Sequence, residues 1–202
     1  ARETMAMVNC AFNPITQDCS RALYLQNVVN LSIEACFAAP STVNKATVEW
    51  ATLLNCHGKV QMEYGGLAKA GTFSGALDLS GSTFGGTDGA TLKSGSIFSR
   101  SCKFVSGTNG WLIANDDTLQ LDIGLDIFSS GVTTSYYLPI DSATVRGRIS
   151  YSAENDSSTG KFEVNSSRVR VINDDESIVS SSSASLSIPF TQTSRQYIAT
   201  AG

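Results

Sequence analysis

The chain has 202 residues and a formal net charge of -4, and only 16% of its residues are charged, compared with roughly 25% in an average soluble domain. Serine and threonine, with 29 and 18 residues, supply most of the polar groups instead. The acidic balance excludes a protein that binds nucleic acid mainly through bulk positive charge, and no apolar run approaches the roughly 18 residues of a membrane helix.

Hydrophobic residues recur mainly with a period of two, which predicts half-buried β-strands. In chain order, the alternating segments are residues 23–37, 60–64, 73–79, 119–127, 145–151, 162–164, 169–171 and 186–190. Clusters of Gly, Asn, Asp and Ser separate these segments and predict turns. Residues 44–54 break the pattern, and their apolar spacing predicts a short helix capped by Ser41 or Asn44.

These elements predict an all-β fold, an eight-stranded antiparallel sandwich or barrel with one short helix before the third strand. No linker or internal repeat divides the sequence, so residues 1–202 are predicted to form a single domain. Residues 1–20 and roughly 191–202 are weakly periodic, which predicts an N-terminal arm and a C-terminal tail. Because the chain starts with Ala1 rather than methionine, we expect Ala1 to mark a processing site.

The residues that enzymes and metal sites use are few and poorly spaced. There are five cysteines, at positions 10, 19, 36, 56 and 102, and one histidine, His57. No CxxC pair is present, and the neighbours Cys56 and His57 would point to opposite faces of a strand. We therefore expect reduced, mostly buried thiols, no catalytic residue, no metal, no cofactor and no enzymatic activity. One or two disulfides in a secreted protein are the alternative.

Acidic residues are concentrated in the second half of the chain. Asp122 and Asp126 occupy the polar positions of an alternating segment, which predicts a solvated strand face rather than the convergent carboxylates of a glycosidase. Residues 116–117 and 174–176 leave a calcium site open as an alternative, because carboxylate clusters suit hard cations.

Four arginines form the most informative basic group. Arg146 and Arg148 share one side of a predicted strand. Arg168 and Arg170 share one side of another. If the two strands are neighbours, four guanidinium groups line one face, where like charges repel unless a partner neutralises them. The group is therefore a candidate contact for RNA or for another subunit, and separate, solvated arginines are the alternative.

Residues 44–79 carry a recognisable order of elements: a short helix with Trp50, a turn at residues 55–58, and two strands separated by a Gly-rich connection. This order resembles the region around strands C and D of picornavirus-like capsid jelly rolls. It is most similar to the small coat protein of comoviruses and fabaviruses, plant viruses of the secovirus family. Residues 147–171 resemble the same proteins further along, whereas residues 80–116 do not match.

The resemblance implies an eight-stranded jelly roll that is cut from a polyprotein at Ala1. It implies a structural capsid protein that assembles with a larger coat protein, and with copies of itself around fivefold axes, into a pseudo-T=3 icosahedral virion packaging positive-strand RNA. Assembly in the host cell cytoplasm, with no membrane partner, fits reduced cysteines. Under this hypothesis the candidate RNA or subunit contacts are Trp50, which can stack on bases, and Arg146, Arg148, Arg168 and Arg170.

Two functions of other classes stay open on the sequence alone. A secreted bacterial filament subunit of the pilin type is also Ser/Thr-rich, β-rich and processed, but it is expected to contain a disulfide. A carbohydrate-binding or hydrolytic β-sandwich requires an exposed aromatic platform or paired carboxylates. Neither feature can be assigned from the sequence.

Overall fold

The computed structural model describes residues 4–12, 21–38, 49–64, 69–85, 89–113, 118–138, 145–151, 161–164, 169–172, 178–181, 186–189 and 195–201. These residues form nineteen β-strands and no helix. The first ten strands are β1 (Thr4–Val8), β2 (Ala11–Phe12), β3 (Arg21–Gln26), β4 (Asn30–Ala38), β5 (Glu49–Tyr64), β6 (Lys69–Asp78), β7 (Thr83–Phe84), β8 (Ala90–Arg100), β9 (Lys103–Phe104) and β10 (Gly107–Ile113). The other nine are β11 (Leu119–Gly124), β12 (Ile127–Phe128), β13 (Val132–Leu138), β14 (Val145–Tyr151), β15 (Lys161–Val164), β16 (Val169–Ile172), β17 (Ile178–Ser181), β18 (Leu186–Pro189) and β19 (Arg195–Ala201).

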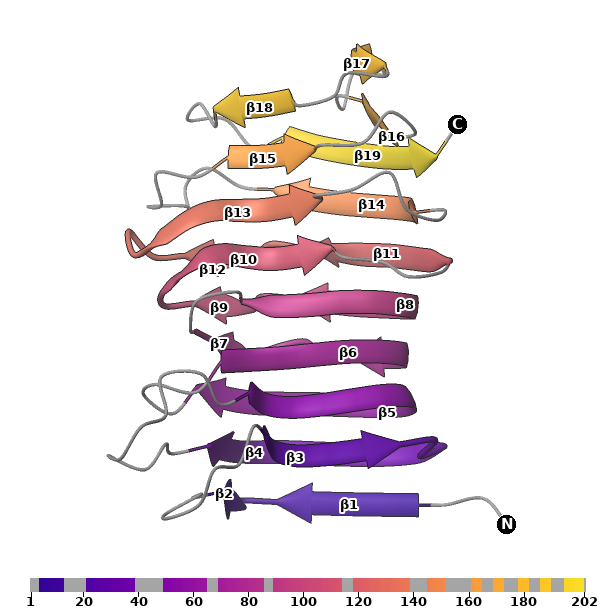
Figure 1. The fold of residues 1–202 in the computed structure, drawn as a ribbon, viewed down its shortest axis with the longest axis vertical. Helices are drawn as coiled ribbons and strands as arrows, with labels where there is room; N and C mark the ends of the chain where they lie inside the picture. The colour runs from indigo at the N-terminus through magenta and orange to yellow at the C-terminus, as the bar shows by residue number, and fades with distance from the viewer. Residues whose placement is uncertain are drawn as a thin grey trace.

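Most neighbouring strands are parallel and come from successive turns of the chain. One run of parallel pairs follows the order β1-β4-β5-β6-β8-β11-β14. A second run, β8-β10-β13-β15, is also parallel, and the short strands β7, β9 and β12 form a separate three-stranded parallel sheet. Figure 1 shows the strands stacked as rungs along the long axis of the molecule, from β1 near one end to β17 at the other. The chain is therefore a parallel β-solenoid of about four turns.

The pairing register repeats from turn to turn. Asp78 on β6 pairs with Phe98 on β8, and Phe98 pairs with Asp122 on β11. Asp122 pairs in turn with Arg148 on β14, so the partners along this row are 20, 24 and 26 residues apart. Because paired residues in a sheet share a face and lie about 4.8 Å apart, each position of the turn forms a row along the solenoid.

The chain reverses its direction at the C-terminal end. β19 pairs antiparallel with both β14 and β16, β18 pairs antiparallel with β15, and β17 pairs antiparallel with β16. The solenoid thus ends on strands that run against its winding, whereas β1 at the other end follows the winding.

The interior is filled by rows of apolar side chains and by one stack of aromatic rings. Phe84, Phe104 and Phe128 occupy paired positions on β7, β9 and β12, and neighbouring ring centroids are 5.2 and 5.0 Å apart. Trp111 packs edge-on against Phe84 and Phe104, and Tyr136 packs edge-on against Phe128. All five side chains are buried. Aromatic pairs with this geometry contribute about 0.5–1.5 kcal/mol beyond burial, so the stack joins consecutive turns.

The turns bend at matching positions that use left-handed backbone. Gly81, Ser101 and Leu125 have φ values of 74°, 57° and 56°, and the amides of Gly81 and Ser101 donate to carbonyls of the next turn. Asn27 and Asn55 bend the first turns in the same way, and the side-chain amide of Asn55 donates to Oδ1 of Asn27 at 2.8 Å. Asparagine tolerates this backbone region better than most residues do.

The predicted antiparallel jelly roll and its short helix are wrong. Residues 49–54 of the predicted helix belong to β5, which pairs with β3, β4 and β6, while residues 44–48 lie outside the described part of the chain. Alternation with a period of two looks the same in parallel and antiparallel strands, so it did not determine the direction of pairing. β1 and β2 fall within the predicted arm 1–20 and β19 within the predicted tail 191–202, so parts of both segments belong to the sheet.

We expect Phe104→Ala to lower the free energy of unfolding by about 3–5 kcal/mol, because it removes a buried ring from the middle of the aromatic stack and leaves a cavity. Ile127→Ala on the adjacent strand is the control, since Ile127 is 43% exposed, and it should cost less than about 1 kcal/mol. Urea denaturation of both variants measures the difference. Equal losses would contradict the role of the stack.

Candidate functional site

The first turn of the solenoid leaves one strand edge open. β1 pairs with β4 along one edge, and no strand pairs with its other edge among the residues that the structure describes. The amide of Asn9 donates to the carbonyl of Glu34 on β4 at 3.0 Å. Because amide directions alternate along a strand, the amides of Thr4, Ala6 and Val8 point to the open edge. Such an edge is a template for pairing with another strand.

The hydrophobic interior is unfinished at the same end. Met5 and Met7 pair with Leu31 and Ile33 on β4, so they occupy the inner rows of the solenoid. Leu31 and Ile33 are buried, with exposures of 4% and 0%, whereas Met5 is 36% exposed. The apolar side chain of Val29 is also exposed, and a depression of about 400 Å³ beside β1 is lined in part by Met5, Val29 and His57. Within the described part of the chain, this layer of the core is therefore partly open to solvent.

A buried carboxylate lies deeper in the structure, where three turns meet. Oδ2 of Asp126 accepts hydrogen bonds from Nε1 of Trp111 at 2.9 Å and from the hydroxyl of Tyr136 at 3.1 Å. Its Oδ1 accepts a hydrogen bond from the amide of Cys102 at 3.0 Å. Asp126 is 1% exposed, so the predicted solvated position of this residue is wrong. Burial raises the pKa of Asp126 to about 6, and the donors from Trp111, Cys102 and Tyr136 oppose the rise.

The four cysteines in the described part of the chain form no disulfide with one another, and three of them are buried, as the sequence predicts for most of the thiols. Burial is the main cause that raises the pKa of Cys36, Cys56 and Cys102 above the ordinary value. A raised pKa keeps these thiols protonated at neutral pH and therefore poorly nucleophilic. Cys19 lies outside the described residues.

The sequence-predicted contact residues are spread over the solenoid. Trp50 lies in β5, Arg146 and Arg148 lie in β14, and Arg170 lies in β16. Arg168 and Ala1 lie outside the described residues, as do residues 116–117 and 174–176 of the calcium alternative. Within the described ranges, no group of three His, Cys, Asp or Glu residues could hold a metal ion. Nor does this part of the chain contain a helix long and apolar enough to span a membrane.

Arg170 lies on β16, which is not a direct neighbour of β14, the strand of Arg146 and Arg148. β19 lies between β14 and β16, and Thr200 pairs with Arg146 on one side and with Arg170 on the other. Arg148 takes the position next to Asp122. The register therefore places Arg146 and Arg170 at the same level with one strand between them, rather than in adjacent strands as the arginine hypothesis required.

The sequence-based interpretation missed the features that the structure brings forward. Met5 and Met7 were assigned to an arm, because the apolar residues Ala6 and Val8 next to them hide the alternation that marks a half-buried strand. Comparison with known proteins adds no assignment: no family model, no curated protein and no solved structure matches this chain. The class that the fold defines is a parallel β-solenoid.

The raised pKa of Asp126 predicts a pH-dependent stability. The folded protein binds the proton with a pKa of about 6, against an ordinary value of 3.8, so this contribution is complete below about pH 4 and is lost as the pH rises through 6. The difference amounts to about 3 kcal/mol. Asp126→Asn removes this titration, so the stability of the wild type relative to the variant should fall by about 2 kcal/mol from pH 4 to pH 6.

Urea denaturation at several pH values measures this difference. Tyr136→Phe removes one donor to the carboxylate and should raise the pKa of Asp126 further, so that the stability contribution is lost at a higher pH. If the stability difference between the wild type and Asp126→Asn does not change with pH, the carboxyl group of Asp126 does not titrate in this range.

Proposed function

We propose that this protein is a non-catalytic structural subunit that associates with a second copy of itself through the open edge of β1. The observation that carries the proposal is the unfinished core at Met5, which is 36% exposed although its partner Leu31 in the next layer is buried. Among the described residues, exposed inner side chains and amides without a strand partner occur together at this end. A second strand placed along β1 satisfies both.

The symmetry of the contact follows from the chemistry of the edge. Two copies related by a twofold axis present the same surface to each other, and their β1 strands then run antiparallel. The amides of Ala6 and Val8, which point to the open edge, bond to carbonyls of the partner strand in this arrangement. Met5 and Met7 of each copy cover the methionines of the other, so each copy completes the last core layer of its partner.

The fold favours a closed pair over an endless fibre. At the C-terminal end the strands run antiparallel to the winding, so the two ends of the solenoid are not equivalent. Head-to-tail growth requires the two ends to complement each other, whereas a twofold contact between β1 edges closes after two copies. This argument favours the pair over the filament subunit of the pilin type.

The narrower hypothesis of a small coat protein stays a prediction. Assembly with a larger coat protein around positive-strand RNA came from a resemblance whose expected fold, the antiparallel jelly roll, is contradicted by the parallel solenoid. Self-association is the part of that hypothesis that the first turn supports. The roles proposed for Trp50 and the arginines in RNA contact also remain predictions.

Two variants of β1 test the pairing. Met5→Lys places a charge in the unfinished core layer, and because Met5 is already part-exposed, the fold should tolerate it. Ala6→Pro removes one amide that points to the open edge and leaves the pairing with β4 in place, since proline is accepted at such edge positions. We expect the wild type to be a dimer at about 10–100 μM and both variants to be monomers by light scattering after size-exclusion chromatography.

Ile127→Lys is the matched control, because Ile127 is a similarly exposed apolar residue on β12, away from β1. It should remain dimeric. A monomeric wild type overturns the proposal. So does a dimer that survives both Met5→Lys and Ala6→Pro.

A further inference from the structure

An exposed aromatic ring lies in the middle of a charged row on the outer face of the parallel sheet. Phe98 on β8 is 41% exposed, and its paired neighbours are Asp78 on β6 and Asp122 on β11. Paired residues share a face, so the ring has a carboxylate on each side across the sheet. Single exposed apolar residues are common on proteins, and it is the fixed surroundings of Phe98 that distinguish it.

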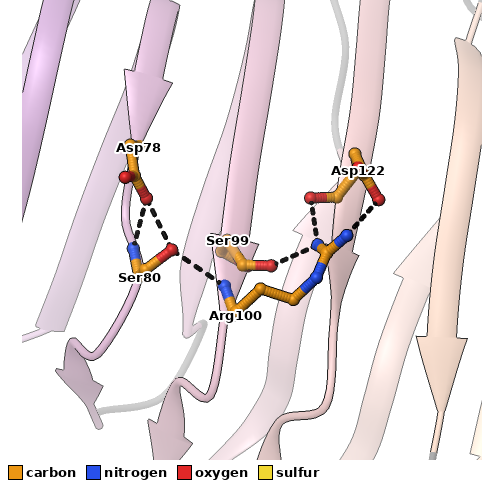
Figure 2. Close-up of polar contacts among 5 residues, drawn as sticks. All are labelled: Asp78, Ser80, Ser99, Arg100 and Asp122. Carbon is orange, nitrogen blue, oxygen red and sulfur yellow. Dashed lines mark hydrogen bonds and ion pairs between the residues drawn. The ribbon is translucent and has the colours of Figure 1, made fainter.

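Arg100 holds one side of the ring. Its Cζ lies 4.6 Å from the centroid of the Phe98 ring. Nη1 donates to the carbonyls of Ser99 and Asp122 at 2.7 and 2.8 Å, and Nη2 donates to Oδ1 of Asp122 at 2.7 Å (Figure 2). The guanidinium is therefore fixed by three hydrogen bonds while it covers one face of the ring.

The first carboxylate of the row is oriented as well. The amide and the hydroxyl of Ser80 both donate to Oδ1 of Asp78, at 2.9 and 2.5 Å. The same hydroxyl oxygen accepts the amide of Arg100 at 3.0 Å, which links the two parts of the cluster (Figure 2). Both hydrogen bonds use Oδ1, so Oδ2 of Asp78 is available to a ligand.

The side of Phe98 away from Arg100 is lined by small and polar residues. Ser96 precedes Phe98 by two positions on the same face of β8, and it pairs with Ala76 on β6 and with Gln120 on β11. All three residues are exposed. A flat ligand can therefore approach the second face of the ring over Ser96 and Ala76, with the amide of Gln120 beside it.

We propose that this face binds a neutral, hydroxyl-rich oligosaccharide, with one sugar ring on the open face of Phe98 and sugar hydroxyls donating to Asp78 and Asp122. A pyranose ring has an apolar face that suits an aromatic surface, and its hydroxyls suit carboxylate acceptors. Small-ligand sites usually combine an apolar contact with a few polar groups that fix the orientation of the ligand. The residues differ from those of the β1 edge, so the two proposals stand or fall independently.

The charges favour a neutral sugar and favour binding over cleavage. The two carboxylates next to the ring disfavour an acidic sugar placed on it, whereas the basic residues that pair with them, Lys59 and Arg148, lie one strand further out. Their strands are two spacings apart, about 10 Å, which exceeds both the separation of about 5–5.5 Å in retaining glycosidases and that of about 6.5–9.5 Å in inverting ones. Asp122 also forms an ion pair with Arg100 at 2.7 Å.

Isothermal titration calorimetry with four hexasaccharides tests the site: a β-1,4-glucan, a β-1,3-glucan, a β-1,4-xylan and the acidic hexagalacturonate. We expect at least one neutral probe to bind with a Kd below about 1 mM and the acidic probe to bind more weakly. Phe98→Ala should weaken binding about tenfold, and Phe98→Trp, which keeps an aromatic face, should retain it. Ile127→Ala, at an equally exposed apolar position, should bind as the wild type does.

Three results would overturn the proposal: no binding of any neutral probe, tighter binding of hexagalacturonate, or equal affinity of Phe98→Ala and the wild type. Met5→Lys should bind as the wild type does whatever its oligomeric state, because Met5 lies outside the row. A loss of sugar binding in Met5→Lys with retained binding in Phe98→Ala would also contradict the assignment of the site.

Discussion

In-register stacking of parallel strands is the constraint on which the rest of this structure depends. Each residue lies about 4.8 Å from its partner in the next turn, so every position must accommodate a neighbour on both sides, and like charges in one row repel. Aromatic rings satisfy this requirement in the interior, where Phe84, Phe104 and Phe128 form one row. On the outer face, the uncharged ring of Phe98 separates the carboxylates of Asp78 and Asp122.

Asp126 shows what the same constraint does to a polar group in the interior. Its hydrogen-bond donors, Cys102, Trp111 and Tyr136, come from different turns, and burial of the carboxylate raises its pKa. A buried polar group is weak support for stability, but it can select one register among several. A slip of one residue would point Trp111 or Tyr136 to the other face of its strand, and Asp126 would lose that donor. The carboxylate therefore favours the observed stacking of the turns.

The sequence predicted the strands better than their arrangement. The alternation of Leu119, Leu121 and Ile123 with Gln120 and Asp122 correctly indicated a half-buried strand. It carried no information on direction, because side chains alternate identically in parallel and antiparallel sheets. The turns differ in length and share no sequence motif, so no fixed repeat in the sequence indicated a solenoid. Alternation predicted the wrong side of the strand for Asp126, because Leu125 has left-handed backbone at φ 56° and interrupts the alternation.

The candidate sites were less predictable, because each depends on which strands are neighbours. Phe98 becomes a possible platform only when Asp78 and Asp122, 20 and 24 residues away, take the adjoining strands. The four arginines form one group only if their two strands are neighbours, and β19, far along the chain, lies between β14 and β16. Spacing within one strand is visible in a sequence, whereas the order of strands in a sheet is set by the whole fold.

The two ends of the solenoid handle the exposed core differently. Stacked-repeat proteins require terminal units that cover the last layer, and the reversal of β18 and β19 supplies strands of another direction at the C-terminal end. At the N-terminal end, the last layer carries Met5 and Met7 instead. Methionine is unbranched and adapts to irregular surfaces, so it suits a layer that meets solvent in one state and a protein surface in another. A β-branched residue at these positions would favour the extended backbone of β1 by itself. Methionine instead agrees with the proposed pairing of β1 with a second copy.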